Sequence, residues 1–587
     1  MLVPVEPSTH RTRDGADIRW AGFFTGHRVM NESDVAALAP RLLGIDASAV
    51  PEAAEKKLIS HYASANGECP ALLLHSATAT LRAFDGDLAE VAAGRRPHDV
   101  ATYVEARSAF LGTANDLSVG RTAPWREAVT LWGVPFVDIG DRSHYYLSQA
   151  LLALAHAHEM GTDTPLDQVI GWLRANPDAV IRVYALDLEM QIFLLWLMDR
   201  AGLARLSTDA NKPVVSQRWN RKRHVHPTVA AARSMESPDD DAESLLEREQ
   251  SLSEARERLG LRLPVLPGYT VLRAEASPDA FVADVLAAAE LLRTRYGLDR
   301  AALKPSEAGD GARIVGNLDL ADSERLATEA RAAYAHGDDY LLEAWVDFLT
   351  ADLGDAALPV VPSGHFRNGC VADGITLQTL SGYAWSGNGY LDEPAWTDLA
   401  LPAGIYRTIR ASLEAVREAF LGPPSVLDGS HQGLATGGID FAVGRVGGRF
   451  GDRLLVGAID FNLSSHGAEY LRTFLDIARR TGVTDRYATT RVFQPPATQT
   501  LAHMEAATAS MTPPNGLLRA IACVPRRWGM VAATGPDPST ASRRAGELVA
   551  VLTDPDGPYA ERHVPVPSQE GAGAEGTRSR ERKTVRP

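Results

Sequence analysis

The stretch that decides the fold is residues 438–462, GIDFAVGRVGGRFGDRLLVGAIDFN, in which two apolar runs flank a glycine-rich turn. This pattern predicts a β-hairpin. Alternation places these apolar side chains opposite the polar ones: Ile439, Phe441 and Val443 in the first run, and Leu455, Ile459 and Phe461 in the second. The polar face then carries Asp440, Asp460 and Asn462. Aspartate is depleted in strands, and carboxylate and amide oxygens suit Mg²⁺, so the face is either a cation site or a solvent-facing side.

Composition limits the classes of function. The 587 residues are 45% hydrophobic and 23% charged, which is ordinary for a soluble chain of three or four domains. A net charge of −15 argues against a broad nucleic-acid surface, although a local basic pocket for one nucleotide remains compatible with it. Three widely spaced cysteines suggest neither a disulfide framework nor a CxxC metal site. We find no signal peptide or membrane span, and therefore expect a cytoplasmic protein.

The first 210 residues or so alternate short apolar runs with amphipathic stretches. The runs at 71–75 and 134–139 have strand length, and 165–173 and 189–201 have helical periodicity. Such alternation predicts an α/β domain with a largely parallel sheet. No GxGxxG motif occurs at a strand-to-helix turn here, so a Rossmann cofactor site is not supported.

Two basic positions come next. Lys222 lies in the cluster SQRWNRKRHVHP, and the acidic run 236–254 that follows is expected to be a solvated helix or loop. Further on, the segment 301–316 begins with a short apolar run that leads to Lys304. Gly309 and Gly311 follow in the same segment. Glycines allow backbone N–H groups to approach an anion, and a lysine adds positive charge. The same residues could equally form a simple strand exit.

A strand-like segment at 340–348 (YLLEAWVDF) carries Glu343, Trp345 and Val346. Backbone groups at such a strand end can meet the edge of adenine while apolar side chains cover the ring. An ordinary strand end is the alternative. The region 369–390 carries Tyr383, Trp385 and Tyr390, which are candidates either for a substrate pocket or for core.

In this order, the motifs resemble the ATP-grasp superfamily from Lys222 to about Asn462, and the whole chain is most similar to pheganomycin-type peptide ligases. The resemblance implies an N-terminal pre-ATP-grasp α/β domain (1–212) and two α+β subdomains that clamp ATP (213–345, which includes the acidic insert, and 346–558). Residues 559–587 are expected to form a disordered tail.

The resemblance also implies roles for residues. It implies that Lys222, on the first strand, contacts phosphate. Lys304 and the loop of Gly309 and Gly311 would contact phosphate as well. Adenine contacts fall to Glu343, Trp345 and Val346, the ribose contact to Asp347 or Asp352, and metal ligation to Asp440, Asp460 and Asn462. Lys304, Arg313 and Asp460 are the expected catalytic residues.

The chain departs from the family at two positions. Ser464 stands where many members carry an arginine, and Gly438 stands where some relatives carry another. Arg313, Arg445 or Arg449 could replace the missing charge.

The implied activity is ATP-dependent ligation of a carboxylate to an amine through an acyl phosphate, with ATP and Mg²⁺ (or Mn²⁺) as cofactors. The expected setting is peptide natural-product biosynthesis, with amino acid or peptide substrates and a possible homodimer. The alternatives are a thiol acceptor, a kinase-type reaction, or a binding protein that has lost catalysis.

Overall fold

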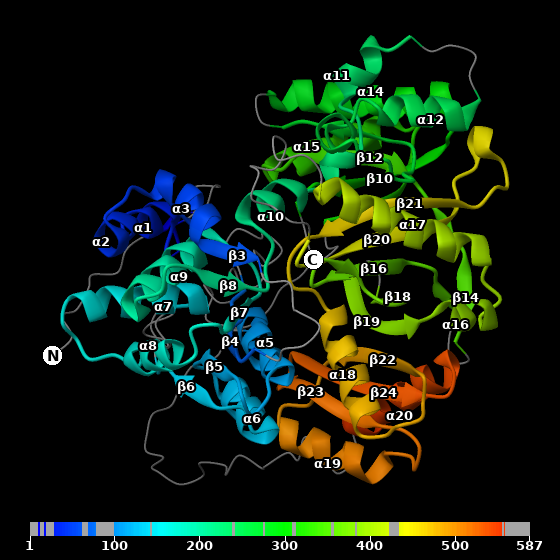
Figure 1. The fold of residues 1–587 in the computed structure, drawn as a ribbon. Coiled ribbons are helices and arrows are strands. Elements are labelled where there is room, and N and C mark those ends of the chain that lie inside the picture. Colours follow the sequence, from blue (N-terminus) through cyan, green and yellow to red (C-terminus); the bar gives the residue numbers. More distant parts are fainter. Residues whose placement is uncertain are drawn as a thin grey trace, which may run out of the picture.

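The structure is a computed structural model that describes residues 10–11, 17–18, 29–60, 69–77, 99–140, 144–236, 241–273, 276–307, 313–353, 357–381, 384–421, 434–554 and 557. It is a mixed α/β chain with one parallel and several antiparallel sheets, which confirms the predicted fold class. Figure 1 shows the three large sheets side by side, with the segments that follow one another in sequence coloured from blue to red. The predicted tail lies outside the described residues.

The N-terminal sheet has six strands, all parallel, in the order β3-β8-β7-β4-β5-β6. The strands are β3 (Leu58–Ser60), β4 (Ala71–Leu74), β5 (Leu117–Gly120), β6 (Phe136–Asp138), β7 (Val180–Val183) and β8 (Leu206–Thr208). Its helices are α1 (Glu32–Ala36), α2 (Ala39–Leu43), α3 (Val50–Lys57), α5 (Asp99–Ser108), α6 (Ala123–Trp132), α7 (Leu147–Glu159), α8 (Leu166–Ala175) and α9 (Leu188–Ala201). The parallel arrangement agrees with the alternation of strands and helices in the sequence.

Helix α9 shows how local sequence sets these elements. Asp187 caps its first turn by accepting the Met190 N–H, and Gly202 ends it in the left-handed conformation at φ +74°. Almost every side chain between the caps is buried, because the helix packs both on the sheet and on its neighbouring helices. The helix therefore belongs to the centre of this domain's core.

The second sheet has four antiparallel strands in the order β11-β10-β12-β9. They are β9 (Gly268–Val271), β10 (Arg300–Pro305), β11 (Val315–Asp319) and β12 (Tyr340–Ala344). Two long helices, α14 (Pro278–Tyr296) and α15 (Ser323–Ala335), share one core with these strands. The shorter helices of this region are α10 (Pro213–Trp219), α11 (Val229–Ser234), α12 (Ala242–Gln250) and α13 (Glu254–Leu259).

The acidic run is not wholly hydrated, contrary to expectation. It forms α12 and the start of α13, and Glu249 on α12 is only 1% exposed. Tyr269 and Tyr296 each donate a hydroxyl hydrogen bond of 2.8 Å to Glu249, and Arg295 forms an ion pair with it. Burial of this carboxylate is possible because its oxygens are all satisfied by donors from α14 and β9.

The third sheet has ten antiparallel strands, whose main path runs β13-β20-β16-β18-β19-β22-β24-β23. The strands are β13 (Asp347–Phe348), β16 (Pro362–Arg367), β17 (Cys370–Val371), β18 (Ile375–Ser381), β19 (Ala384–Leu391), β20 (Thr436–Arg445), β21 (Leu455–Asn462), β22 (Tyr487–Phe493), β23 (Leu518–Val524) and β24 (Trp528–Gly535). Its helices are α16 (Glu393–Asp398), α17 (Ala403–Phe420), α18 (Ala468–Arg480), α19 (Leu501–Met511) and α20 (Pro538–Thr553). A separate small hairpin joins β14 (Thr350–Asp352) to β15 (Ala357–Pro359).

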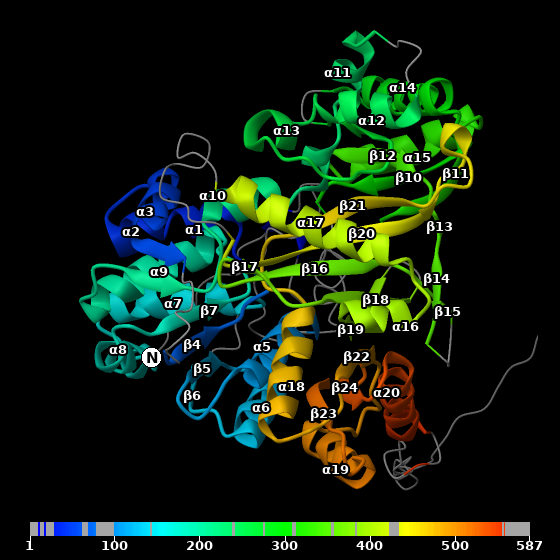
Figure 2. The ribbon, with the colours of Figure 1, turned by 45° about the vertical axis from the view of Figure 1, so that its right-hand side comes forward.

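Strands β20 and β21 form the predicted hairpin and lie next to the four-stranded sheet, as the two views in Figures 1 and 2 agree. Helix α17 covers the opposite face, where its buried side chains share a core with Ile439, Phe441 and Phe461. A side chain at Gly364 would collide with Leu413 of α17, which explains glycine at that contact. Of the two faces of the hairpin, one is thus fixed by α17 and the other is left for the second sheet.

No helix in the described ranges is both long and apolar enough to span a lipid bilayer.

Candidate functional site

The three predicted metal ligands meet on one face of the β20–β21 hairpin. Asp440 and Asp460 are direct partners in the strand register. Asn462 pairs with Gly438, two residues away along each strand. Asn462 donates its side-chain N–H to Asp440 Oδ2 at 3.1 Å. On the next strand, Ser363 is the register partner of Asp440 and donates its hydroxyl to Oδ1 at 2.5 Å. The structure therefore brings together the three side chains that the sequence pattern selected.

A β-bulge makes this arrangement possible. Near the turn, Phe441 pairs with Ala458, whereas Asp440 pairs with Asp460, so Ile459 is an extra residue on β21. In a regular ladder, Asp460 would pair with Ile439 and share its core face against α17. The bulge moves Asp460 to the side of Asp440.

The same bulge corrects one prediction. Leu455 and Ile459 were expected to lie opposite the acids, but both pack against the core of the four-stranded sheet. Leu455 is the partner of Gly444, which lies four residues from Asp440 on its strand and therefore on the same face. Simple alternation along β21 was wrong because it assumed an unbroken period of two.

Lys222 faces the hairpin from a short helical turn. It lies in the 3₁₀ helix η4 (Lys222–Val225), not on a strand as the resemblance implied. Its backbone N–H donates to the Ser306 carbonyl at 3.1 Å, which fixes the turn to the end of β10. Its ammonium Nζ lies 2.9 Å from Asp460 Oδ1, and its side chain is 10% exposed. Lys222 is thus a nearly buried cation placed directly on the acidic face.

Lys304 occupies the centre of a buried polar network. Its Nζ lies 2.6 Å from Glu343 Oε2 and donates to the Ile459 carbonyl at 3.2 Å, so it bridges β10, β12 and β21. The other oxygen of Glu343 lies 2.7 Å from His226 Nε2. Burial opposes ionisation of Glu343, but Lys304 and His226 together hold its pKa below the usual value. Two cationic side chains therefore reach the hairpin: Lys222 from η4 contacts a carboxylate, and Lys304 from β10 contacts the backbone at the bulge.

The electrostatics of the acid pair fit a divalent cation. Burial and the nearby Asp460 raise the pKa of Asp440 to about 6, against the lowering effect of Ser363, Gln378 and Lys222. A cation between the two carboxylates would relieve this repulsion. In the described part of the chain, no three His, Cys, Asp or Glu side chains converge as a metal cage. Two carboxylates and one amide suit Mg²⁺, which usually shares its coordination with water and phosphate.

The predicted adenine residues lie at the end of β12. Glu343 is the last but one residue of that strand, and its carboxylate is engaged by Lys304 and His226. The Trp345 N–H donates to the Arg300 carbonyl at 3.1 Å, and Val346 is buried in the core of the four-stranded sheet. Their contact with adenine stays a prediction.

The two ribose candidates lie on different strands. Asp347 is on β13 and pairs with Arg300 at 2.6 Å, whereas Asp352 is on β14. Neither position decides which of them would contact a ribose, so the choice stays open.

The structure does not bring Arg313 to the acid pair. Its guanidinium lies 2.6 Å from Oδ2 of Asp338, two residues before β12, and its catalytic role stays a prediction. Gly309 and Gly311 lie outside the described residues. Arg445 donates to the Asp452 carbonyl at the hairpin turn. Five residues of extended strand separate it from Asp440, which corresponds to about 16 Å.

Several positioning residues were missed by the sequence reasoning. Asn211 is 1% exposed, and its amide bonds the Thr436 and Leu463 carbonyls and the Ala435 N–H at 2.8–2.9 Å. It thereby ties the open end of the hairpin to the segment between β8 and α10. His226 and Ser363 were also missed; the only signal in the sequence was the HVHP motif beside Lys222.

Comparison with known proteins gives structural likenesses at low identity. No family model and no curated protein matches the chain. N5-carboxyaminoimidazole ribonucleotide synthetase from Thermus thermophilus is 14% identical over 76% of this chain and 96% of its own, with a TM-score of 0.39. The biotin carboxylase domain of 2-oxoglutarate carboxylase from Hydrogenobacter thermophilus, solved with MgADP and bicarbonate, is 11% identical over 82% and 89%, with a TM-score of 0.39. D-cycloserine synthetase is 14% identical over 70% and 99%, with a TM-score of 0.30. At these TM-scores the likenesses leave the family of the chain open.

Proposed function

We propose that the chain is an ATP-dependent carboxylate-amine ligase of ATP-grasp type. One observation carries the proposal: Lys222 and Lys304, from the side of the four-stranded sheet, meet Asp460 and the bulge of the β21 strand across the junction of two sheets. Cationic side chains on one wall and a pair of carboxylates on the other are what a Mg²⁺-nucleotide needs, because its phosphates and its metal carry opposite charges.

The existing contacts indicate how the nucleotide would fit. The ammonium groups of Lys222 and Lys304 would bind phosphate oxygens, and Asp440, Asp460 and Asn462 would hold Mg²⁺, which neutralises charge on the phosphates when bound. Phosphate binding would require Lys222 to exchange Asp460 for a ligand oxygen. Lys304 is held more firmly, because it has both Glu343 and a backbone carbonyl as partners.

The reaction that follows has two steps. A substrate carboxylate oxygen attacks the γ-phosphorus of ATP, and the bond to the β,γ-bridging oxygen breaks to release ADP. The amine then attacks the acyl carbon, phosphate leaves, and the amine gives up a proton to form the amide. The task of the protein is positioning and electrostatic stabilisation, which needs no covalent nucleophile from the chain.

The carboxyl ends of the parallel strands are where the substrates would enter. In open α/β sheets, ligands bind outside these ends. The Ser465 N–H, three residues after Asn462, donates at 3.0 Å to the carbonyl of Tyr184, which directly follows β7. This contact supports substrate binding between the N-terminal sheet and the acid pair. We further propose amino acid or peptide substrates and a role in peptide natural-product biosynthesis.

The test is ATP turnover with mixed amino acids, short peptides and a panel of carboxylic acids, with hydroxylamine present to trap acyl phosphate. The proposal expects ADP and a hydroxamate that depend on a carboxylate and are lost in Asp460→Asn. Asp452→Asn is the matched control, because Asp452 is an exposed aspartate at the turn of the same hairpin. Release of AMP would contradict the mechanism. ATP binding without turnover of any substrate tested would instead favour the alternative of a nucleotide-binding protein without catalysis.

A further inference from the structure

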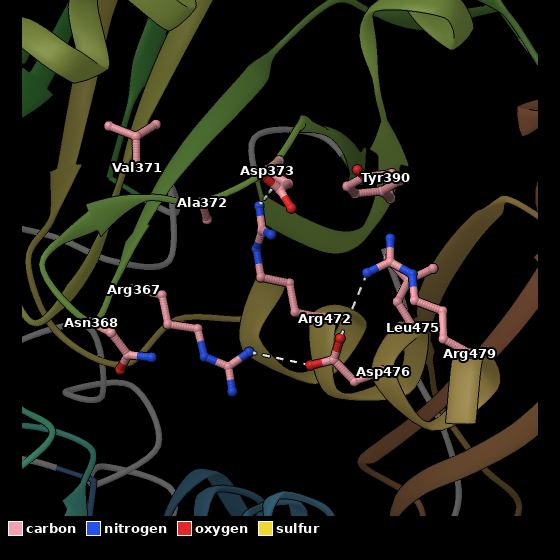
Figure 3. Close-up of a pocket in the computed structure, with 10 residues that line it drawn as sticks. All are labelled: Arg367, Asn368, Val371, Ala372, Asp373, Tyr390, Arg472, Leu475, Asp476 and Arg479. Carbon is pink, nitrogen blue, oxygen red and sulfur yellow. Dashed lines mark hydrogen bonds and ion pairs between the residues drawn. The ribbon is translucent and has the colours of Figure 1, made fainter. Parts of the chain in front are cut away.

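A cavity lies on the side of the ten-stranded sheet that faces α18. Its volume is about 250 Å³, and it is lined by Arg367, Asn368, Val371, Ala372, Asp373, Tyr390, Arg472, Leu475, Asp476 and Arg479. Figure 3 shows three guanidinium groups and two carboxyl side chains around it. Arg472, Leu475, Asp476 and Arg479 lie three and four residues apart on α18, so one face of that helix forms a wall.

The charges in this cavity are unevenly paired. Asp476 is shared by Arg367 at 3.5 Å and by Arg479 at 3.8 Å. Arg472 donates to the backbone carbonyl of Asp373 at 2.8 Å, but its Nε is buried without a hydrogen-bond partner. No carboxylate lies within ion-pair distance of Arg472 among the residues that the structure describes. Burial accordingly lowers the pKa of Arg472 to about 10.

A carboxylate and an apolar wall complete the cavity. The side chain of Asp373 is exposed at its rim, and within the described ranges no hydrogen bond or ion pair engages its carboxyl oxygens. Val371, Leu475 and Tyr390 supply apolar surface to the same lining. Among the described residues, a guanidinium without a carboxylate partner and a carboxylate without a cationic partner thus border one small space.

We propose that this cavity binds a free α-amino acid. The α-carboxylate would pair with Arg472, whose guanidinium can donate a charge-assisted hydrogen bond. The ammonium group would meet Asp373, and the side chain would lie on Val371, Leu475 and Tyr390. The volume lies below the range of pockets that hold drug-sized molecules, which suits a ligand as small as an amino acid.

The cavity is separate from the candidate nucleotide site. Arg367 and Ser363 lie on the same strand four residues apart, which puts the cavity about 13 Å along β16 from Asp440. The inference therefore does not depend on the proposed ligase activity, and binding here can be measured without ATP.

The experiment is isothermal titration calorimetry of the full chain with each of the twenty L-amino acids, without nucleotide. We expect at least one with an apolar side chain to bind, and its analogues that lack either the amino or the carboxyl group to bind at least tenfold more weakly. Arg472→Gln and Asp373→Asn should each weaken binding at least tenfold. Arg480→Gln, an exposed arginine of the same helix outside the cavity, should leave it unchanged.

Three results would overturn the inference. These are the absence of binding up to 10 mM for all twenty amino acids, equal binding of the analogue without an amino group, and binding that survives Asp373→Asn. Asp373 is exposed, so that variant keeps the test valid even where Arg472→Gln disturbs folding. ATP binding is measured separately on the same samples. It shows whether the nucleotide site is present, independently of amino acid binding in the cavity.

Discussion

Replacing Lys304 by methionine tests two things together: whether Lys304 binds the nucleotide, and how much stability is lost when Glu343 loses its partner. The Lys304 and Glu343 side chains are 8% and 5% exposed and are joined at 2.6 Å. Loss of one partner of such a pair leaves a buried charge, which costs about 3–5 kcal/mol. We expect Lys304→Met to lower the melting temperature by on the order of 10 °C.

A double variant separates stability from binding. In Lys304→Met/Glu343→Gln no uncompensated charge remains, and the glutamine oxygen can still accept from His226. We expect its melting temperature to return to within about 3 °C of the parent chain, because the buried charge was the cost. ATP affinity should not return, since a phosphate partner worth about 2 kcal/mol or more is missing, which corresponds to about 30-fold.

The assays are circular dichroism melting and calorimetric titration with Mg·ATP, on the parent chain and both variants. The reasoning would be refuted by a double variant that binds ATP as tightly as the parent. In that outcome the pair has only a structural role, and the lysine does not belong to a phosphate site. A single variant as stable as the parent would show that Glu343 finds another partner.

Three further variants extend these tests. Asp440→Asn should abolish ADP release yet leave the melting temperature unchanged or a few degrees higher, because it removes a repulsion that raises the pKa of Asp440. Asn211→Leu should lower the melting temperature by several degrees. It leaves buried backbone groups without a hydrogen-bond partner, which costs about 1–3 kcal/mol each. Burial lowers the pKa of His224 to about 4, so the folded chain loses stability as pH falls from about 6.5 toward 4, by up to about 3 kcal/mol. His224→Gln should therefore shrink the melting difference between pH 7.5 and 5, whereas exposed His503→Gln should not.

Much of the fold follows from local pattern. The parallel N-terminal sheet follows from its alternating strands and helices, and the hairpin follows from two apolar runs around glycines. The meeting of Asp440 and Asp460 was also predictable, because both stand out as acids within apolar strands. These are local signals: the hairpin is contained in residues 438–462, and each strand and helix of the parallel sheet has its own short pattern.

What could not be predicted depends on contacts between distant segments. Glu249 belongs to an acidic run that is typical of solvated helices, and its burial depends on two tyrosines and Arg295 from β9 and α14. His226 gains its role from Glu343, which lies 117 residues away. Asn211 acts on a hairpin more than 220 residues further along the chain. No local periodicity encodes such partnerships.

The extra residue at Ile459 also limits how this chain can evolve. Insertions at the exposed residues 451–453 would lengthen the tip of the turn and leave both acids in place. Deletion of Ile459 alone would remove the bulge and leave Asp460 paired with Asp440 in a regular ladder, but it would also remove the carbonyl that accepts from Lys304. Descendants of this gene should accordingly tolerate length changes at that tip, while the extra residue at Ile459 is retained for its backbone contact with Lys304.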